Sequence, residues 1–262
     1  MTNKANRQEQ LESMLQSFHL PSFKKQYLTY ARKCELEKID HVGYLFELSK
    51  TEHDDRYNRK ADRLLRQAKL PTGKRLDDFD LSHVPALSPS RVQELSEGTG
   101  LDAYENILIF GNPGTGKTHL AISLAREWCL RGRQVYFVTA ANLVQQLLAA
   151  KRDLKLNSLL KKFDKFEAII IDDLSYIPQE REETDVLFVL LAERYERRSV
   201  VITSNLPFSK WDSIFKDPIT AMAAVDRLVH HSTILELNGE SYRVTAASRK
   251  KNSSKSAPTT AK

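Results

Sequence analysis

The sequence predicts an α/β protein in which a parallel sheet of five strands lies between helices, preceded by a small region that is entirely helical. Three observations support this prediction. Apolar residues recur at helical spacing as far as residue 70, and from residue 104 short apolar runs alternate with helix-like stretches. The first of these runs leads into the glycine-rich loop Gly111–Thr118 and then into a helix-like run. Such alternation is typical of a parallel sheet that is covered on both faces.

In the N-terminal region, the apolar residues Leu11, Leu15 and Phe18 recur at helical spacing, and the pattern continues to about Leu70. Asp40 is placed to cap a longer helix. Basic residues at positions 56–74 fall mostly on the other faces of that helix. A solvated helix surface and a contact with DNA or a protein partner explain these charges equally well.

Changes in composition divide the chain into four parts. We expect a helical N-terminal domain at residues 1–70, and a linker at 71–103 that contains prolines, glycines and one helix near 91–97. The α/β domain is expected at residues 104–246, followed by a disordered basic tail at 247–262. The predicted strands are Asn106–Phe110, Gln134–Val138, Ala168–Asp172, Ser199–Thr203 and Thr233–Leu237.

The composition favours a soluble protein with an anionic partner. The 262 residues include 40 Lys and Arg against 34 Asp and Glu, and clustered basic residues are common in proteins that bind nucleic acid. Cys34 and Cys129 lie far apart and lack the spacing of zinc ligands, so we expect neither a disulfide framework nor a zinc site. The polar N-terminus and the lack of a long apolar segment predict a cytoplasmic protein that does not contact membranes.

The strongest motif is the glycine-rich loop, which matches the pattern GxxxxGK[ST] in the context of a strand followed by a helix. Glycines allow backbone N–H groups to turn inward around phosphates, and the following helix directs its partial positive charge to the same place. Lys117 is expected to contact the β- and γ-phosphates, and the Thr118 hydroxyl to bind Mg²⁺. The motif therefore predicts a site for ATP and magnesium. The residues expected to contact ATP are Gly111, Asn112, Pro113, Gly114, Thr115, Gly116, Lys117, Thr118 and His119.

A second magnesium ligand is expected at the end of the strand that precedes Asp173. Asp172 is placed to hold Mg²⁺ through water, and Asp173 to orient or deprotonate the attacking water. The strand at 134–138 intervenes in the sequence, which distinguishes this pattern from kinases and GTPases whose two nucleotide strands are neighbours. If the strand at 199–203 lies between the other two in the sheet, Asn205 would face the γ-phosphate.

Four segments together resemble one family. The loop and its helix are shared by many families, whereas the other three segments, in this order, are far more specific. The chain is similar over nearly its whole length to IstB, the ATPase encoded beside the transposase in certain insertion sequences. This family lies in the AAA+ clade that also contains helicase loaders of the DnaC type. The four segments are Gly114–Ala121, Thr203–Phe208 with Trp211, Asp226–Ser232 and Gly239–Arg243.

The resemblance implies an AAA+ P-loop ATPase whose nucleotide site is completed by assembly. Asn205 corresponds to the sensor of the γ-phosphate, and Arg227 to an arginine finger that inserts into the site of a neighbouring subunit. Because many AAA+ proteins carry Glu where this chain has Asp173, we expect slow, switch-like hydrolysis. Rival candidates for the arginine finger are Arg194, Arg197 and Arg198. The expected catalytic residues are Lys117, Asp172, Asp173, Asn205 and Arg227, with Thr118 and Asp172 as metal ligands.

The resemblance also implies a prokaryotic, DNA-associated homo-oligomer. It would assemble on duplex DNA, deform it and help its transposase to choose insertion sites, with the N-terminal region serving assembly and partner contact. DNA binding would be largely independent of sequence and sensitive to salt. Candidate DNA contacts are the basic residues at 56–74, the tail, and Lys151, Arg152, Lys155, Lys161 and Lys162.

Two other functions would also use an ATP site of this kind. A replicative helicase loader would share the ATPase core but bind a helicase and single-stranded DNA; the long helical N-terminal region without zinc ligands argues against it. A small-molecule kinase would leave the segments around Asn205 and Arg227 unexplained. His230 and His231 have no acidic or cysteine partner at ligand spacing, so we interpret them as packing or helix-end residues.

Overall fold

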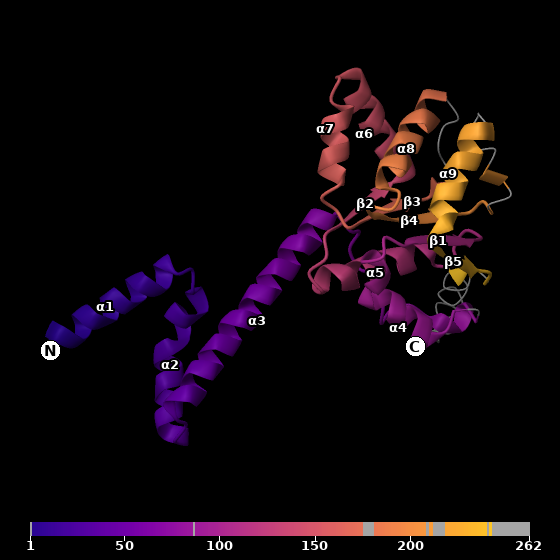
Figure 1. Cartoon of the computed structure of the whole chain (residues 1–262). Helices are drawn as coiled ribbons and strands as arrows, with labels where there is room; N and C mark the ends of the chain where they lie inside the picture. The colour runs from indigo at the N-terminus through magenta and orange to yellow at the C-terminus, as the bar shows by residue number, and fades with distance from the viewer. Residues whose placement is uncertain are drawn as a thin grey trace, which may run out of the picture. The chain divides into compact units, whose positions relative to one another are not determined.

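The computed structural model of the chain describes residues 2–85, 87–174, 181–207, 210–211, 218–239 and 241–242. The chain divides into two compact units, Met1–Arg63 and Leu64–Lys262 (Figure 1). Among the described residues, no helix combines the length and the apolar composition that a membrane crossing requires. The four-part division expected from composition stays a prediction.

The first unit consists of α1 (Thr2–Ser17), α2 (Pro21–Glu37) and the part of α3 (His41–Ala68) that extends to Arg63. The predicted cap of α3 is confirmed, since the Asp40 carboxylate accepts a hydrogen bond of 2.8 Å from the N–H of Gly43. Glu52 of α3 is buried and accepts hydrogen bonds from the Ser22 N–H and from the Arg56 guanidinium. This carboxylate therefore joins the first turn of α2 to α3.

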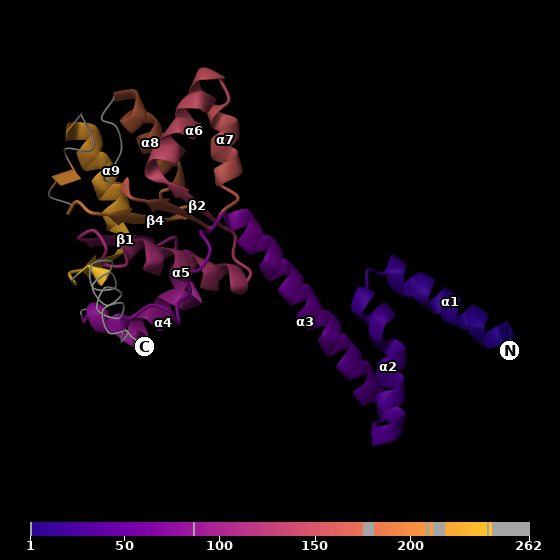
Figure 2. The same ribbon diagram turned by 180° about the vertical axis from the view of Figure 1, so that it is seen from behind.

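The second unit contains the predicted five-stranded sheet between helices (Figures 1 and 2). Each predicted strand is present, with bounds that differ from the expected ones by at most one residue. In chain order the elements are η1 (Leu81–His83), α4 (Pro89–Glu97), η2 (Thr99–Leu101), β1 (Asn106–Gly111), α5 (Lys117–Leu130), β2 (Val135–Thr139), α6 (Ala140–Arg152), α7 (Leu156–Phe163), β3 (Ala168–Asp172), α8 (Arg181–Arg194), β4 (Ser199–Ser204), α9 (Pro218–His230) and β5 (Ser232–Leu237).

The strand order is β2-β3-β4-β1-β5, and all neighbouring strands are parallel. In the register of the central pair, Ile107 of β1 lies opposite Val201 of β4. The strand that separates β1 from β3 in the sheet is thus β4. By contrast β2, which separates them in the sequence, lies at an edge.

Alternate residues of each strand contribute to two separate cores, because successive side chains point to opposite faces of a sheet. Leu108 and Phe110 of β1 belong to the core formed with α6, α8 and α9. Ile107 and Ile109 belong to the core formed with α4 and α5. Figure 2 shows α6, α7, α8 and α9 on one face of the sheet and α4 and α5 on the other.

Residues 71–103 include the helix expected near 91–97, which is α4. Val84, Val92 and Leu101 are buried in the core next to α5. The indole N–H of Trp128, on α5, donates a hydrogen bond of 2.8 Å to the carbonyl oxygen of Leu95. This segment therefore packs against the sheet domain.

A buried arginine joins the last turn of α8 to α7 and β4. Only 2% of the Arg194 surface is exposed. Its guanidinium donates hydrogen bonds to the carbonyl oxygens of Phe163 and Phe166, both 3.0 Å long, and of Ser199, 2.9 Å long. Burial lowers the pKa of Arg194 to about 9, so the side chain remains charged at neutral pH.

We predict that Arg194→Met lowers the free energy of unfolding of the second unit by about 3 kcal/mol or more, since several buried carbonyl oxygens lose a charged donor. Urea unfolding followed by tryptophan fluorescence measures the change, because Trp128 and Trp211 both lie in the core of this unit. The control is Arg197→Met: that side chain is 58% exposed and pairs with Asp164, so its loss should cost less than about 1 kcal/mol. Equal losses in the two variants would contradict the prediction.

Candidate nucleotide site

The glycine-rich loop lies at the carboxyl end of β1, directly before α5. Gly114 and Gly116 have φ angles of 87° and 98°, in the region that favours glycine. A Cβ atom on Gly114 would collide with the Ser241 side chain, and one on Gly116 would lie 2.9 Å from the Phe79 ring. The loop conformation therefore requires glycine at both positions, and segments from both ends of the second unit pack against it.

Lys117 is the first residue of α5 and is 7% exposed. Its ammonium donates hydrogen bonds of 2.7 Å and 2.8 Å to the carbonyl oxygens of Gly111 and Asn112. The backbone of the loop thus holds a positive charge beside the first N–H groups of α5. An ammonium and a helix N-terminus together favour a phosphate group at this point.

The Asp172 carboxylate is 9% exposed and lies at the end of β3. One of its oxygens, Oδ1, accepts a hydrogen bond of 2.8 Å from the Thr118 hydroxyl and one of 2.7 Å from the Thr203 hydroxyl. These contacts connect α5, β3 and β4 at the carboxyl edge of the sheet. Thr118 and Asp172, which the motifs predict as magnesium ligands, are therefore in direct contact, whereas no sequence pattern singles out the Thr203 hydroxyl.

Asp173 follows β3 with a φ of 62°, the left-handed region that few residues other than glycine adopt. Its N–H donates to the Thr203 hydroxyl at 2.9 Å, and its carboxylate accepts a hydrogen bond of 3.2 Å from the Asn205 side chain. β4 lies between β1 and β3, which is the condition under which Asn205 is expected to face the γ-phosphate. This strand order also brings Asn205 beside Asp173.

The Thr118 and Asp172 oxygens fit a magnesium ion. They are 2.8 Å apart, and adjacent oxygen ligands of octahedral Mg²⁺, each bound at about 2.0–2.1 Å, lie about 2.9 Å apart. An alcohol and a carboxylate are also ligands that Mg²⁺ prefers.

A cavity of about 510 Å³ lies over the loop, a volume typical of sites for small molecules. Several of its aromatic residues carry no signal in the sequence, because no periodic pattern marks them in the segment expected to be a linker. The Phe79 ring lies edge-on to His119, and His83 lies edge-on to Tyr242. The lining residues are Gly73, Lys74, Asp78, Phe79, Asp80, His83, Pro113–His119, Asp173, Thr203, Asn205 and Tyr242.

The structure places Arg227 away from this cavity. Arg227 lines a small pocket together with Asn106 and Val200, which lie at the amino ends of β1 and β4. The six residues of β1 span about 20 Å, so Arg227 is on the edge of the sheet opposite the glycine-rich loop. Its guanidinium lies over the Phe188 ring at 5.0 Å, and among the described residues its buried Nη1 has no hydrogen-bond acceptor.

The three rival arginines make local contacts. Arg194 is buried and donates to backbone carbonyls. Arg197 forms ion pairs with Asp164 and Glu193, and Arg198 donates to the carbonyl oxygen of Asp164. Of the four candidates, Arg194 and Arg227 each have a buried nitrogen without an acceptor in the described part of the chain, Nε of Arg194 and Nη1 of Arg227. Both terminal nitrogens of Arg194 donate to carbonyl oxygens.

The arrangement of strands, loop and carboxylates agrees with a comparison to known proteins. The family of IstB-like ATP binding proteins matches residues 10–252. The chain belongs to this family. A putative insertion sequence ATP-binding protein of Sinorhizobium fredii is 42% identical over 231 residues, which is 88% of this chain and 78% of that protein. The putative ATP-binding protein of insertion sequence IS5376 of Geobacillus stearothermophilus is 37% identical over 236 residues, 90% of this chain and 94% of the relative.

Solved structures confirm the predicted fold class. The chain is similar to AMPPCP-bound DnaA from Aquifex aeolicus, with a TM-score of 0.55 and 21% identity over 71% of this chain and 56% of DnaA. It is also similar to the DnaC helicase loader, with a TM-score of 0.51 and 16% identity over 62% of this chain and 96% of the loader. At these identities the likeness concerns the fold alone.

We predict that Thr203→Val raises the Kd for ATP in the presence of Mg²⁺ about 10-fold, because it removes a donor from Asp172 and an acceptor from the Asp173 N–H. Titration with a fluorescent ATP analogue, with Mg²⁺ or with EDTA, measures the effect, which should be smaller in EDTA. The control is Thr139→Val, at the end of β2, where the hydroxyl caps α6 through the Asn142 N–H. If both variants bind the magnesium complex as the wild type does, the Thr203 hydroxyl has no part in the site.

Proposed function

We propose that this protein is an ATP-dependent regulator of transposition, which hydrolyses ATP in sites shared between subunits. As an oligomer on duplex DNA it would assist its transposase in target selection and activation. One observation carries the proposal: the nucleotide cavity and Arg227 lie at opposite edges of the same sheet. A subunit whose arginine is about 20 Å from its own loop can complete a site only in a neighbour.

The proposed hydrolysis assigns a role to each group in the cavity. Lys117 contacts the β- and γ-phosphates, and Thr118 and Asp172 hold Mg²⁺, directly or through water. Asp173 orients the attacking water as a base, and the amide of Asn205 holds both the Asp173 carboxylate and the γ-phosphate. The shared contact between Asp173 and Asn205 supports this pairing.

Phe79, His83 and Tyr242 are proposed to hold the adenine base. Their rings surround the part of the cavity beside the loop, and aromatic faces stack well on a base. The Tyr242 N–H also donates to the carbonyl oxygen of Gly114, which fixes the tyrosine beside the phosphate loop.

Exposed basic residues on the α6–α7 hairpin are the DNA contacts that the structure supports best. Five of them are exposed, in the last turn of α6, in the link between the two helices and in α7. In the first unit, by contrast, Arg56 and Arg59 are engaged with the buried Glu52. The basic tail lies outside the described residues. The five surface residues are Lys151, Arg152, Lys155, Lys161 and Lys162.

The N-terminal unit is proposed to bind a protein partner. Phe18, Val42 and Phe46 are 66%, 75% and 63% exposed, so these large apolar side chains are available to a partner. The transposase is the proposed partner because the relatives are proteins of insertion sequences.

We predict that two inactive variants restore each other. Lys117→Ala removes nucleotide binding, and Arg227→Ala lowers hydrolysis about 10³-fold while ATP still binds. In an equal mixture, about a quarter of neighbouring pairs combine an intact loop with an intact Arg227, so about a quarter of the wild-type rate should return. Phosphate release in the presence of duplex DNA measures the rate, and light scattering measures assembly.

Arg197→Ala is the matched control for the mixing experiment, since this exposed arginine is paired within its own subunit. It should keep the wild-type rate alone. A mixture that stays inactive although light scattering shows mixed oligomers would contradict a role for Arg227 in a neighbouring site.

We predict that Lys161→Ala with Lys162→Ala weakens binding to random duplex DNA and reduces the dependence of log K on log salt by about 2. Fluorescence anisotropy at several salt concentrations measures both. The control is Lys24→Ala with Lys25→Ala, an adjacent lysine pair on α2. An unchanged slope would remove the hairpin from the interface, and tighter binding to single-stranded DNA would favour the helicase-loader interpretation.

A further inference from the structure

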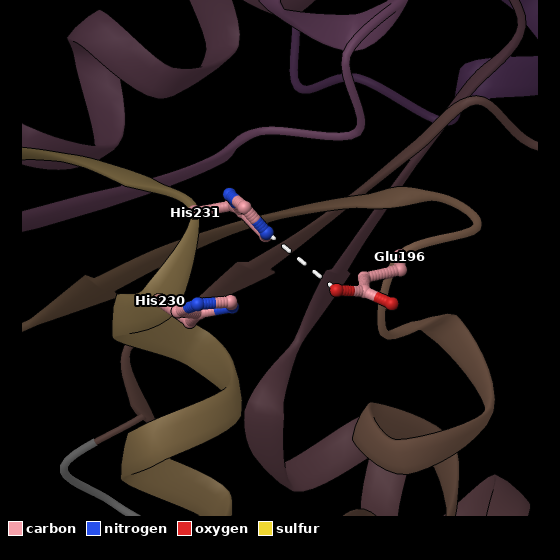
Figure 3. A group of neighbouring side chains, drawn as sticks. All are labelled: Glu196, His230 and His231. Carbon is pink, nitrogen blue, oxygen red and sulfur yellow. Dashed lines mark ion pairs between the residues drawn. The ribbon is translucent and has the colours of Figure 1, made fainter.

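Two histidines and a glutamate meet at the amino edge of the sheet, away from the nucleotide cavity (Figure 3). His230 is the last residue of α9, as the helix-end interpretation expected, and His231 directly precedes β5. Sequence spacing supplied no acidic partner for them, but the fold does: Glu196, in the turn between α8 and β4, lies beside both rings. The folded chain therefore supplies the acidic neighbour that sequence spacing does not.

The distances suit a metal ion. One ligand atom from each residue lies within 4.8 Å of the others, and His231 Nε2 is 3.6 Å from Glu196 Oε1. Tetrahedral ligands bound to zinc at about 2.0–2.2 Å lie about 3.4 Å apart. The His231 and Glu196 side chains are 49% and 56% exposed, so small rotations that bring all three ligands to this spacing meet little obstruction.

A neighbouring tyrosine orients one of the rings. The Tyr195 hydroxyl lies 2.9 Å from Nδ1 of His230. When Nδ1–H donates to this hydroxyl, Nε2 is left unprotonated, which is the state that binds a metal. Glu196 follows with a φ of 54°, a conformation rare outside glycine. One turn of the chain thus supplies both a ligand and the group that orients another.

We propose that Glu196, His230 and His231 bind a divalent transition metal ion of the zinc class, with a coordination position open to water or to a ligand from another molecule. Imidazole nitrogens and one carboxylate are a donor set that zinc accepts. Within the described residues this is the one such group of three. The two cysteines do not compete, because both are buried and burial raises the pKa of Cys129 to about 12.

The bound ion would connect the turn after α8 to the end of α9. Glu196 and Arg227 line the same small pocket, and Arg227 lies one helical turn before His230. The ion would therefore restrain the segment that carries Arg227. This consequence rests on the proposed function, whereas metal binding itself does not.

The experiment uses the full chain without an affinity tag, freed of metal by a chelator. Titration with Co²⁺ should give the visible absorption of a coordinated ion at one equivalent per chain, and Zn²⁺ should displace it. Glu196→Gln and His231→Ala should each weaken zinc binding, measured by calorimetry, by at least about 10-fold. The control is His53→Ala, which removes an exposed histidine beside a single carboxylate, Asp54, and should change nothing.

Cobalt absorption that persists in Glu196→Gln, or that is lost equally in His53→Ala, would overturn the proposed site. A second measurement concerns Arg227: one equivalent of Zn²⁺ should change ATP hydrolysis of the wild type but not of Glu196→Gln. If cobalt binds as expected and hydrolysis does not respond, the metal site stands and its link to Arg227 fails. If the protein hydrolyses no ATP at all, the proposed function fails while the cobalt result still decides the site.

Discussion

The Asp172 carboxylate accepts hydrogen bonds from Thr118 and Thr203, and the geometry of the nucleotide site depends on these two contacts. A buried carboxylate is stable only if neighbouring donors replace water. Here the donors come from the first turn of α5 and from β4. The hydrogen bonds to this one carboxylate therefore hold the glycine-rich loop and α5 against β3 and β4. The Thr203 hydroxyl also accepts from the Asp173 N–H, and this contact extends the constraint to the next carboxylate.

The order of strands illustrates what the sequence could and could not predict. Apolar runs such as Ile107–Phe110 and Ala168–Ile171 predict strands because both faces of a parallel sheet are buried. Such runs do not determine which strands are neighbours in the sheet, since a fully buried strand fits beside any other. The apolar runs alone therefore do not predict that β4 lies between β1 and β3. The structure shows that it does.

The nucleotide site likewise contains residues that the sequence predicts and residues that it does not. The residues of the loop are contiguous, and their chemistry follows from glycines, a lysine and a threonine in a fixed order. Phe79 and Glu196 reach their places only through folding, from segments with no characteristic spacing. The contact of Thr203 with Asp172 depends on the order of the strands. A segment rich in proline and glycine was expected to be a linker. It packs on the sheet domain because its apolar residues, among them Val84 and Leu101, are buried.

The sequence offers several arginines near the amino edge of the sheet as candidates for the arginine finger. Their contacts in the structure distinguish them. Arg194 donates to four backbone carbonyl oxygens and is fixed in place. Arg227 is half-buried, and its Nη1 has no acceptor among the described residues. A buried donor without an acceptor costs about 1–3 kcal/mol. A phosphate group of the nucleotide bound to a neighbouring subunit would supply that acceptor, because Arg227 is partly exposed. Arg194 also has a nitrogen without an acceptor, Nε, but only 2% of this residue is exposed, so a neighbouring subunit does not reach it.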